Sequence, residues 1–486
     1  MFKRTPITLA FGLLALGGQA FAATSYFDNF TPLSSSAGVT ANEAVPFVLS
    51  SPNFSQKILA DRATQNLVTP GSNSGNWDMI AANETGPDAG RYLFMPFETS
   101  TGGVMRVDLW NNNYNTRSVS IVSPGTQGFV AGDASRWTPW GSYLTGEECW
   151  GGVCSTLGKG RLFEVTNATA AGAGTGTLVH RNVLPRVSHE GLAFDNAKSL
   201  YFIDELNGGA VFKYVSANAN ATTGDQYFDK GQTFVLKVGA GSQFEGNNGP
   251  AITGAATWVA ITSATGTPLA NTFSALVNLG GGSFSMDGRA AAGLVGATGY
   301  NRPEDLELQD AAGTQRLYFA TTDSDTNGNS ADGRSRVYFL DTATNEVKLF
   351  ADASTIDLAT GLAVGGGLRN ADNLAIDAKG NIYIIEDRNG GVDNDIWFAR
   401  DLNKDGDLLD AGEGIGRWAS NGVAGSENTG LYFDKFDANV AYVNIQHPSS
   451  GVDRLVQITA VPEPETYAMM LAGLVGLGFM ARRRKV

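Results

Sequence analysis

Short apolar segments alternate with turns rich in Gly, Asn, Asp and Thr along most of the chain, and one pattern recurs. Each copy begins with an acidic residue, continues as a short apolar strand, turns, and returns as a second strand that carries a Tyr. Good copies cover residues 188–205, 302–319 and 370–387, and a looser copy covers 427–443. A repeat that is regular in chemistry but irregular in spacing predicts sheets arranged radially, joined by loops of variable length.

Amphipathic helical patterns are almost absent between the two ends of the chain, so the patterning predicts an all-β protein, a β-propeller. The segment 215–300 is rich in Ala, Asn, Gly and Thr and holds only short strand-like pieces. We interpret it as a long loop insertion in one blade. The chain has 486 residues, 61 of them Gly, and a single large propeller fits this length.

The acids that open equivalent strands are expected at matching positions around the propeller axis. This places Glu190, Glu304 and Asp372, together with Glu427 of the looser copy, in a ring at one end of the channel. Carboxylates so close repel one another unless a cation neutralises them, so three good copies favour a metal site. The alternative is that each acid is a solvated turn residue, which is the better interpretation of any single copy. The formal charge of -14 suits bound cations and argues against a nucleic-acid partner.

The N-terminus has the three parts of a secretory signal peptide over residues 1–22. Lys3 and Arg4 precede an apolar run over residues 7–17, and Ala20-Phe21-Ala22 forms a small-residue cleavage site. No twin Arg is present, so a Sec-type route is favoured. An uncleaved anchor is the alternative, but the run is short for a membrane span.

The C-terminus, residues 461–486, also has three parts. A Pro-Glu-Pro sequence at residues 462–464 precedes an apolar stretch over 467–480 and a basic end, Arg482-Arg483-Arg484-Lys485. This tail resembles the PEP-CTERM sorting signal of Gram-negative bacteria that produce exopolysaccharide. The resemblance implies an exosortase partner that processes the tail, transient anchoring by the C-terminal helix, and export through the periplasm to the cell surface or extracellular matrix. A simple membrane anchor is the alternative, and the propeller domain is expected over residues 23–460.

An aspartate-rich loop predicts a second candidate metal site. Oxygen-bearing side chains occupy its first, third, fifth and seventh positions, namely Asp401, Asn403, Asp405 and Asp407. Gly406 stands at the sixth position, as in the first half of an EF-hand-like calcium loop. The acid expected at position twelve falls on Gly412, and Glu413 follows one residue later. The pattern is equally compatible with calcium binding and with a solvated turn.

Other reactive side chains are few. Cys149 and Cys154 lie five residues apart in an exported chain, which favours a small-loop disulfide over a thiolate metal ligand at Cys149. The chain has no G-x-S-x-G motif, so a serine hydrolase elbow is unsupported.

Four motifs occur in order along the chain: Tyr143-Leu144-Thr145-Gly146-Glu147-Glu148, His189-Glu190, Arg302-Pro303-Glu304, and Asp372-Asn373-Leu374 with Ile385-Glu386-Asp387. In this order they resemble the PhoX-type alkaline phosphatases, from about residue 90 to residue 450. The resemblance implies a six-bladed propeller whose channel mouth holds a cluster of iron and calcium and hydrolyses phosphate monoesters.

The resemblance also implies roles for single residues. The metal ligands would be Glu148 or Glu147, together with Glu190, Glu304 and Asp372, and Glu386 is a further candidate. Arg302 would bind the phosphate, since a guanidinium offers two parallel donors to an oxyanion. The catalytic candidates are therefore Arg302 and Glu148.

The chain departs from the family at Gly146, where relatives have a cysteine that binds iron. Loss of a soft thiolate favours hard oxygen ligands and calcium, and leaves iron as the less favoured cofactor. The leading hypothesis is a secreted metal-dependent phosphoesterase that acts on a phosphate ester. The alternatives are a non-catalytic calcium-binding propeller of the cell surface or matrix, and a different hydrolase on the same scaffold, such as a lactonase-like calcium propeller.

Overall fold

The structure, a computed structural model, describes residues 25–39, 42–69, 75–150, 158–246, 249–280, 283–311, 313–322, 335–388 and 394–461. The predicted signal peptide over residues 1–22 and the apolar stretch of the tail over 467–480 lie outside these ranges. Among the described residues, no helix is long and apolar enough to cross a membrane.

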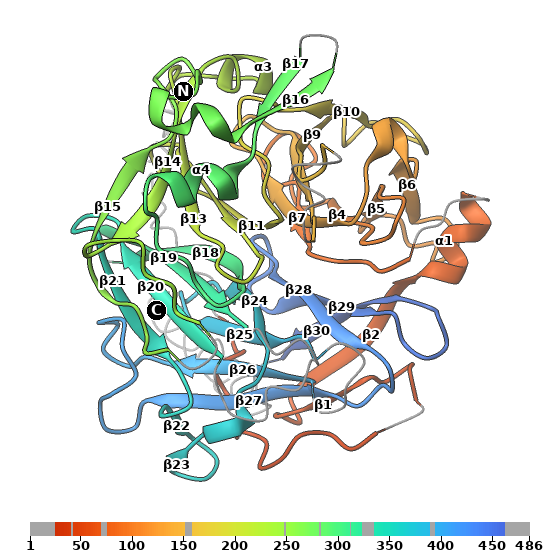
Figure 1. Cartoon of the computed structure of the whole chain (residues 1–486). Coiled ribbons are helices and arrows are strands. Elements are labelled where there is room, and N and C mark those ends of the chain that lie inside the picture. Colours follow the sequence, from red (N-terminus) through yellow and green to blue (C-terminus); the bar gives the residue numbers. More distant parts are fainter. Residues whose placement is uncertain are drawn as a thin grey trace, which may run out of the picture.

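Antiparallel sheets surround the middle of the molecule, so the predicted all-β propeller is confirmed (Figure 1). The first sheet along the chain contains β3 (Ala81–Ala82), β4 (Tyr92–Pro96), β5 (Val104–Asp108) and β6 (Ser118–Val122). The next contains β7 (Gly132–Trp137), β8 (Tyr143–Glu147), β9 (Leu162–Thr166) and β10 (Thr177–His180).

A nine-stranded sheet follows, in which two four-stranded units are joined through one shared strand. The first unit contains β11 (His189–Phe194), β12 (Leu200–Asp204), β13 (Val211–Ser216) and β14 (Gly231–Val238). The joining strand is β15 (Gly254–Ala260), which pairs with β21. The second unit contains β18 (Pro303–Ala311), β19 (Thr314–Thr321), β20 (Arg336–Asp341) and β21 (Glu346–Ala351).

The C-terminal part forms two more sheets. One contains β24 (Ala371–Ile376), β25 (Ile382–Glu386), β26 (Asn394–Arg400) and β27 (Gly414–Asn421), extended by β22 (Ile356–Asp357), β23 (Leu362–Ala363) and β1 (Phe47–Leu49). The other contains β28 (Glu427–Phe433), β29 (Val440–Gln446), β30 (Arg454–Ala460) and β2 (Phe54–Asp61). Because β2 pairs with β30, a strand from the start of the chain completes the last sheet and closes the ring.

Counting the nine-stranded sheet as two blades gives six four-stranded units, and this count of blades stays a prediction. The predicted insertion within 215–300 contains the hairpin β16 (Leu276–Gly280) and β17 (Ser283–Met286) beside short helices. The helices are α1 (Arg62–Val68), α3 (Gly224–Tyr227) and α4 (Gly288–Leu294), with 3-10 turns η1 (Thr126–Gly128), η2 (Ala270–Ala275) and η3 (Gly365–Gly367).

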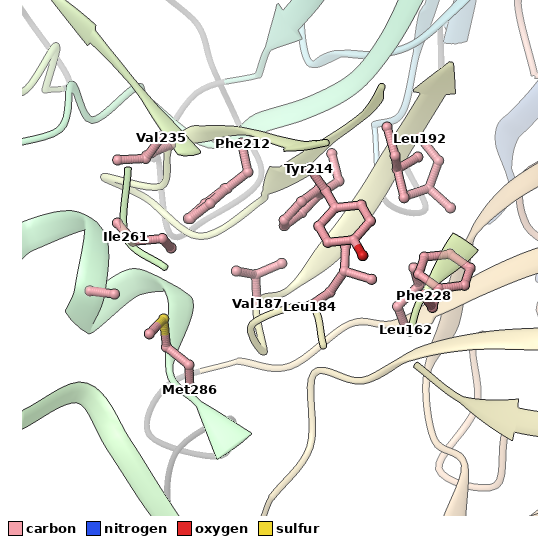
Figure 2. Close-up of a cluster of buried hydrophobic side chains, with 14 of the residues drawn as sticks. Leu162, Leu184, Val187, Leu192, Phe212, Tyr214, Phe228, Val235, Ile261 and Met286 are labelled. Atoms are coloured by element: carbon pink, nitrogen blue, oxygen red, sulfur yellow. The ribbon is translucent and has the colours of Figure 1, made fainter. Parts of the chain in front are cut away.

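Apolar side chains fill the wedges between neighbouring sheets. Figure 2 shows one cluster in which Leu162 of β9 and Leu192 of β11 pack with Phe212 and Tyr214 of β13. The insertion adds Met286 to the same cluster, so it is anchored to the propeller core. Burial of such side chains stabilises the fold by about 1.5–3 kcal/mol each.

Glycines allow the innermost strands to approach closely around the axis. A Cβ atom at Gly191 of β11 would lie 2.2 Å from the backbone nitrogen of Leu306 in β18. At Gly430 of β28 it would lie 2.6 Å from the backbone nitrogen of Ile80, and the φ of +62° there also favours glycine. At these two points inner strands of different sheets therefore pack backbone against backbone.

Candidate metal centre

At five places around the ring an acidic residue lies in a β-bulge. Each bulge follows directly after the first paired residue of the inner hairpin. In β11 the register shifts between His189 and Leu192, and Glu190 lies in the shift. A bulge sets two residues opposite one and redirects a side chain. The acids in equivalent bulges of the sheets are Asp78, Asp133, Glu190, Glu304 and Asp372. The sixth position, in β28, is Gly430.

These side chains converge. Glu190, Glu304 and Asp372 each present one carboxylate oxygen within 4.8 Å of the others. Asp133 lies within hydrogen-bond reach of Glu190, and its charge helps to raise the pKa of Glu190. The structure therefore brings together the three acids that the repeat predicts, and adds Asp133 beside them.

A second row of acids comes from the ends of the neighbouring strands. Glu98, Glu148, Glu205 and Asp387 each follow the second strand of a hairpin by one or two residues, and His447 occupies this position after β29. Glu148 interacts with both Glu98 and Glu205 through hydrogen bonds between carboxyl groups. Glu427, the acid of the looser repeat, pairs with the ring of His447 and interacts with Asp387.

The residue just before each of these acids faces away from the centre. Glu147 is buried and accepts hydrogen bonds from Arg161 Nε at 2.8 Å and Arg161 Nη2 at 2.5 Å. Glu386 accepts hydrogen bonds from Trp397 Nε1 at 2.9 Å and from two backbone amides. Since successive side chains of a strand point to opposite faces, Glu148 and Asp387 face the centre where Glu147 and Glu386 cannot.

The electrostatics of the centre are unfavourable without a counter-ion. Burial, and then the neighbouring carboxylates, raises the pKa of Glu190 and of Glu148 well above the usual range. The pKa of Glu304 is also raised, first by burial, although Arg302 opposes the shift. Neither carboxylate oxygen of Glu304 accepts a hydrogen bond. Buried oxygens of this kind need either protons or cations.

The positively charged guanidinium of Arg302 lies at the rim of the acidic cluster. Its Nη2 atom donates to Glu205 Oε1 at 2.7 Å and lies 3.1 Å from Glu304 Oε1. Burial lowers the pKa of Arg302, but Glu304 and Glu205 outweigh that effect and raise it further, so the guanidinium stays charged. Its φ of +47° is unusual for a non-glycine residue, and such strain is frequent at functional sites.

Trp150 covers this corner of the centre. Its ring lies under the guanidinium of Arg302, 4.8 Å from centroid to Cζ, and its Nε1 atom donates to Glu148 Oε1 at 2.5 Å. Trp150 is 45% exposed, so it stands between the cluster and solvent. The adjacent Cys149 is disulfide-bonded, which excludes it as a thiolate ligand, and Cys154 lies outside the described residues.

Two amide side chains position the acids. Asn373 Nδ2 donates to Asp372 Oδ1 at 2.7 Å and to Glu190 Oε1 at 3.2 Å. Gln446 Nε2 donates to Asp78 Oδ2 and to Glu98 Oε2, each at 2.9 Å. Asn373 thus joins carboxylates of two sheets, and Gln446 of β29 joins two acids beside the β3–β4 hairpin.

The space beside Gly146 is already filled. A Cβ atom at Gly146 would lie 2.3 Å from the Cβ atom of His189, so a cysteine does not fit against this histidine. The ring nitrogens of His189 have no hydrogen-bond partner, and burial lowers its pKa to about 3. His189 is therefore a neutral packing residue, and Glu190 is the residue of this motif that lies in the acidic cluster.

The aspartate-rich loop does not join the cluster. Residues 401–413 connect β26 to β27, whereas Asp372 lies at the start of β24. The antiparallel order β24-β25-β26 puts the end of β26 at the opposite end of the sheet from Asp372. Asp401, Asn403, Asp405 and Asp407 thus lie at the other end of this sheet from Asp372.

Some acids of the centre were not predicted. Asp78 and Asp133 open inner strands like the predicted acids, and the sequence signal was present at Trp77-Asp78 and Gly132-Asp133. Glu98, Glu205 and Asp387 each follow an apolar strand by one or two residues, and Glu205 and Asp387 are the second of two acids in the sequence. The first two sheets lack a clear copy of the repeat, which concealed the equivalence.

Comparison with known proteins identifies two family models that match the chain. The family model described as alkaline phosphatase PhoX matches residues 134–449, and the model of the PEP-CTERM protein-sorting motif matches residues 460–485. No curated protein matches the sequence. The C-terminal match marks an exported protein with a sorting tail.

Several solved structures are similar to this chain at low sequence identity. Pseudomonas fluorescens PhoX in complex with vanadate, a transition state analogue, is 16% identical with a TM-score of 0.60, covering 89% of this chain and 98% of that one. A luciferin-regenerating enzyme is 8% identical with a TM-score of 0.38, covering 81% and 94%. The Dos1 propeller is 9% identical with a TM-score of 0.36, covering 82% and 94%. Only the first score is high enough to support the fold.

Proposed function

Because the chain belongs to the alkaline phosphatase PhoX family, we propose that it is an exported, metal-dependent phosphoesterase that hydrolyses phosphate monoesters at the acidic centre. The observation that carries this proposal is the convergence of Glu190, Glu304 and Asp372 beside a charged arginine, Arg302. An acidic cluster alone would repel a phosphate. Cations held by the carboxylates, together with a guanidinium, would make the same place attractive to it.

The residues fit bound cations. The donors are carboxylate oxygens, several are buried, and those of Glu304 accept no hydrogen bond. Hard oxygen donors suit calcium, and Gly146 in the place of the family cysteine leaves iron as the alternative. Glu148, Glu190, Glu304 and Asp372 would hold the ions, with Asp133 as an added ligand. When bound, such ions act as Lewis acids on phosphoryl oxygens and lower the pKa of a coordinated water.

Arg302 would orient the substrate phosphate. Its Nη2 atom is engaged by Glu205, while its Nε atom is buried and has no hydrogen-bond partner. A phosphoryl oxygen accepting from this edge would satisfy that donor with a charge-assisted hydrogen bond. Trp150 limits the rotation of the guanidinium through its stacked ring. Glu148, bonded to the same indole, would keep its carboxylate directed at the ions rather than at solvent.

The test uses mature protein purified without chelator, assayed with a generic phosphomonoester and analysed for bound metals. Arg302→Ala is expected to lower kcat/KM by about 10²–10³-fold, the usual cost of removing one preorganised donor. It should also weaken inhibition by vanadate, the analogue bound in the Pseudomonas fluorescens protein. Arg91→Ala is the matched control, because Arg91 also pairs with a carboxylate, that of Asp108, and also lies over a tryptophan ring, that of Trp110. Unchanged turnover in Arg302→Ala would refute the assigned role.

A non-catalytic calcium-binding propeller is the second candidate. The observation that favours it is the close contact between Gly146 and His189, which leaves no room for the cysteine of the family. In that case the ions would only hold the sheets together. Removal of metal would then lower the melting temperature strongly, and no metal would support turnover of any phosphomonoester.

A further inference from the structure

The loop between β26 and β27 carries five acidic residues at the end of its sheet away from the acidic centre. The strands β24, β25 and β26 are antiparallel neighbours, so the loop after Arg400 lies beside the turn between β24 and β25. Lys404 confirms this placement, because its Nζ atom donates to Asn381 Oδ1 of that turn at 2.8 Å. The loop is therefore independent of the phosphoesterase proposal.

Asp401 has a carboxylate oxygen that is buried without a partner. Its Oδ2 atom accepts from the backbone nitrogen of Gly406 at 3.0 Å, so the carboxylate is directed across the loop. Gly406 adopts a φ of +92°, which permits this tight turn. Asp401 is only 8% exposed, and its Oδ1 atom accepts no hydrogen bond. A buried carboxylate oxygen is costly unless a donor or a cation reaches it.

Two further carboxylates converge inside the loop. Asn403 Nδ2 donates to Asp405 Oδ2 at 2.9 Å and to Asp410 Oδ2 at 2.7 Å. The Oδ1 atom of Asn403 accepts from the backbone nitrogen of Asp405 at 2.9 Å, which fixes its side chain within the turn. Asp405 and Asp410 thus meet at one donor group, and a cation would bring the same oxygens together.

The basic residues near the loop do not neutralise its acids. Arg316 donates through Nη1 to the carbonyl oxygen of Lys404 at 3.0 Å and through Nη2 to that of Asp405 at 2.8 Å. Within the described residues, no Lys or Arg forms an ion pair with a carboxylate of residues 401–413. Arg316 therefore holds the backbone of the loop in place, and Lys404 is the one basic residue of 401–413, against five acids.

Glu413 does not act as the twelfth-position ligand. Its Oε1 atom accepts from the backbone nitrogen of Leu402 at 2.8 Å, and its Oε2 atom accepts from that of Asp410 at 3.2 Å. Both oxygens are thus occupied by the backbone of the loop. Asp410, in contrast, directs its Oδ2 atom at the side chain of Asn403.

We propose that this loop binds one calcium ion through Asp401, Asn403, Asp405 and Asp410, with the carbonyl oxygen of the seventh position, Asp407, as a further ligand. All donors are oxygen, and calcium accepts such irregular sets more readily than magnesium does. The bound ion would hold the β26–β27 hairpin closed at its turn.

Hydrogen exchange of the full mature chain tests the proposal locally. Protein stripped with EGTA is compared with and without CaCl2, and exchange is followed in peptides that cover residues 401–413. Extracellular calcium modules bind with Kd of about 10⁻⁴–10⁻³ M, so about 10 mM calcium should slow exchange of the loop by about tenfold or more. Magnesium at the same concentration should have a smaller effect.

Four variants test whether the calcium effect arises from ligands in this loop. Asp401→Asn should abolish the slowing of exchange by calcium. Asp405→Asn, at an exposed position of the loop, should do the same and replaces the first variant if that variant does not fold. Asp437→Asn is the matched control in a different exposed turn, and Glu304→Gln removes an acid of the centre, so both should keep the calcium-dependent slowing. The proposal is overturned if wild-type exchange is insensitive to calcium, or if both loop variants respond as the wild type does.

Discussion

Adjacent acids at the end of a strand point in opposite directions in this protein. Glu147 is satisfied by Arg161 inside its sheet, whereas Glu148 faces other carboxylates and Trp150. The same alternation separates Glu386 from Asp387. An acidic side chain at the end of a strand is therefore not enough to assign a ligand, because the pleat of the strand decides which of two neighbours faces the centre.

Glu148 and Glu147 can be compared directly by replacing each of them with glutamine. Glu148→Gln should lower turnover at least about tenfold and weaken metal binding, while the metal-free protein is as stable as the wild type or more so, since one repelling charge is gone. Glu147→Gln should instead cost about 1–3 kcal/mol of stability, because it weakens a buried hydrogen-bonded ion pair, and should leave metal content unchanged. Thermal unfolding and elemental analysis of both variants check this, and equal effects in the two would contradict the assignment.

At the scale of elements, the inner strands combine a bulge with close backbone packing. The bulge turns Glu190, Glu304 and Asp372 toward one another, and Gly191 allows β11 to lie against β18. The position of the acids thus depends on backbone packing between strands, such as that of Gly191 against Leu306, as well as on the acids themselves.

Gly191→Ala tests this dependence. A Cβ atom there would lie 2.2 Å from the backbone nitrogen of Leu306, which cannot move without displacing β18, so we expect a loss of about 3 kcal/mol in unfolding free energy. Gly293→Ala in α4 is the control, because nothing lies within 4 Å of its Cβ position and alanine favours the helix. Urea unfolding of both variants measures the difference. A Gly191→Ala protein as stable as the control would show that the strands are not tightly packed.

At the scale of the whole molecule, acids from different sheets meet at one end of the ring. The pKa values of Asp78, Asp133, Glu190, Glu304 and Asp372 are all raised, with burial as the first cause. The folded metal-free protein therefore holds protons more tightly than the unfolded chain does. This contribution to stability is present below the unfolded values of about 4 and is lost as the pH rises.

The melting temperature should consequently depend on pH in opposite ways with and without metal. In excess EDTA it should fall between pH 5 and pH 8, as the acids lose their protons. With excess calcium it should rise or stay level over the same range, because cation binding requires ionised carboxylates. Differential scanning calorimetry measures both series, and Glu304→Gln should show a shallower fall in EDTA. Identical profiles in EDTA and calcium would argue against a metal centre.

The sequence determined the all-β propeller, the exported character of the chain, and the acids that open the clearest strands. These features depend on local patterns of polar and apolar residues, which any short segment carries with it. The inclusion of Asp78 and Asp133 in the centre, and the placement of Glu147 and Glu386 on the faces away from it, follow only from the tertiary structure. Each depends on bulges, strand faces and sheet ends, and these are set by contacts between segments far apart in the chain.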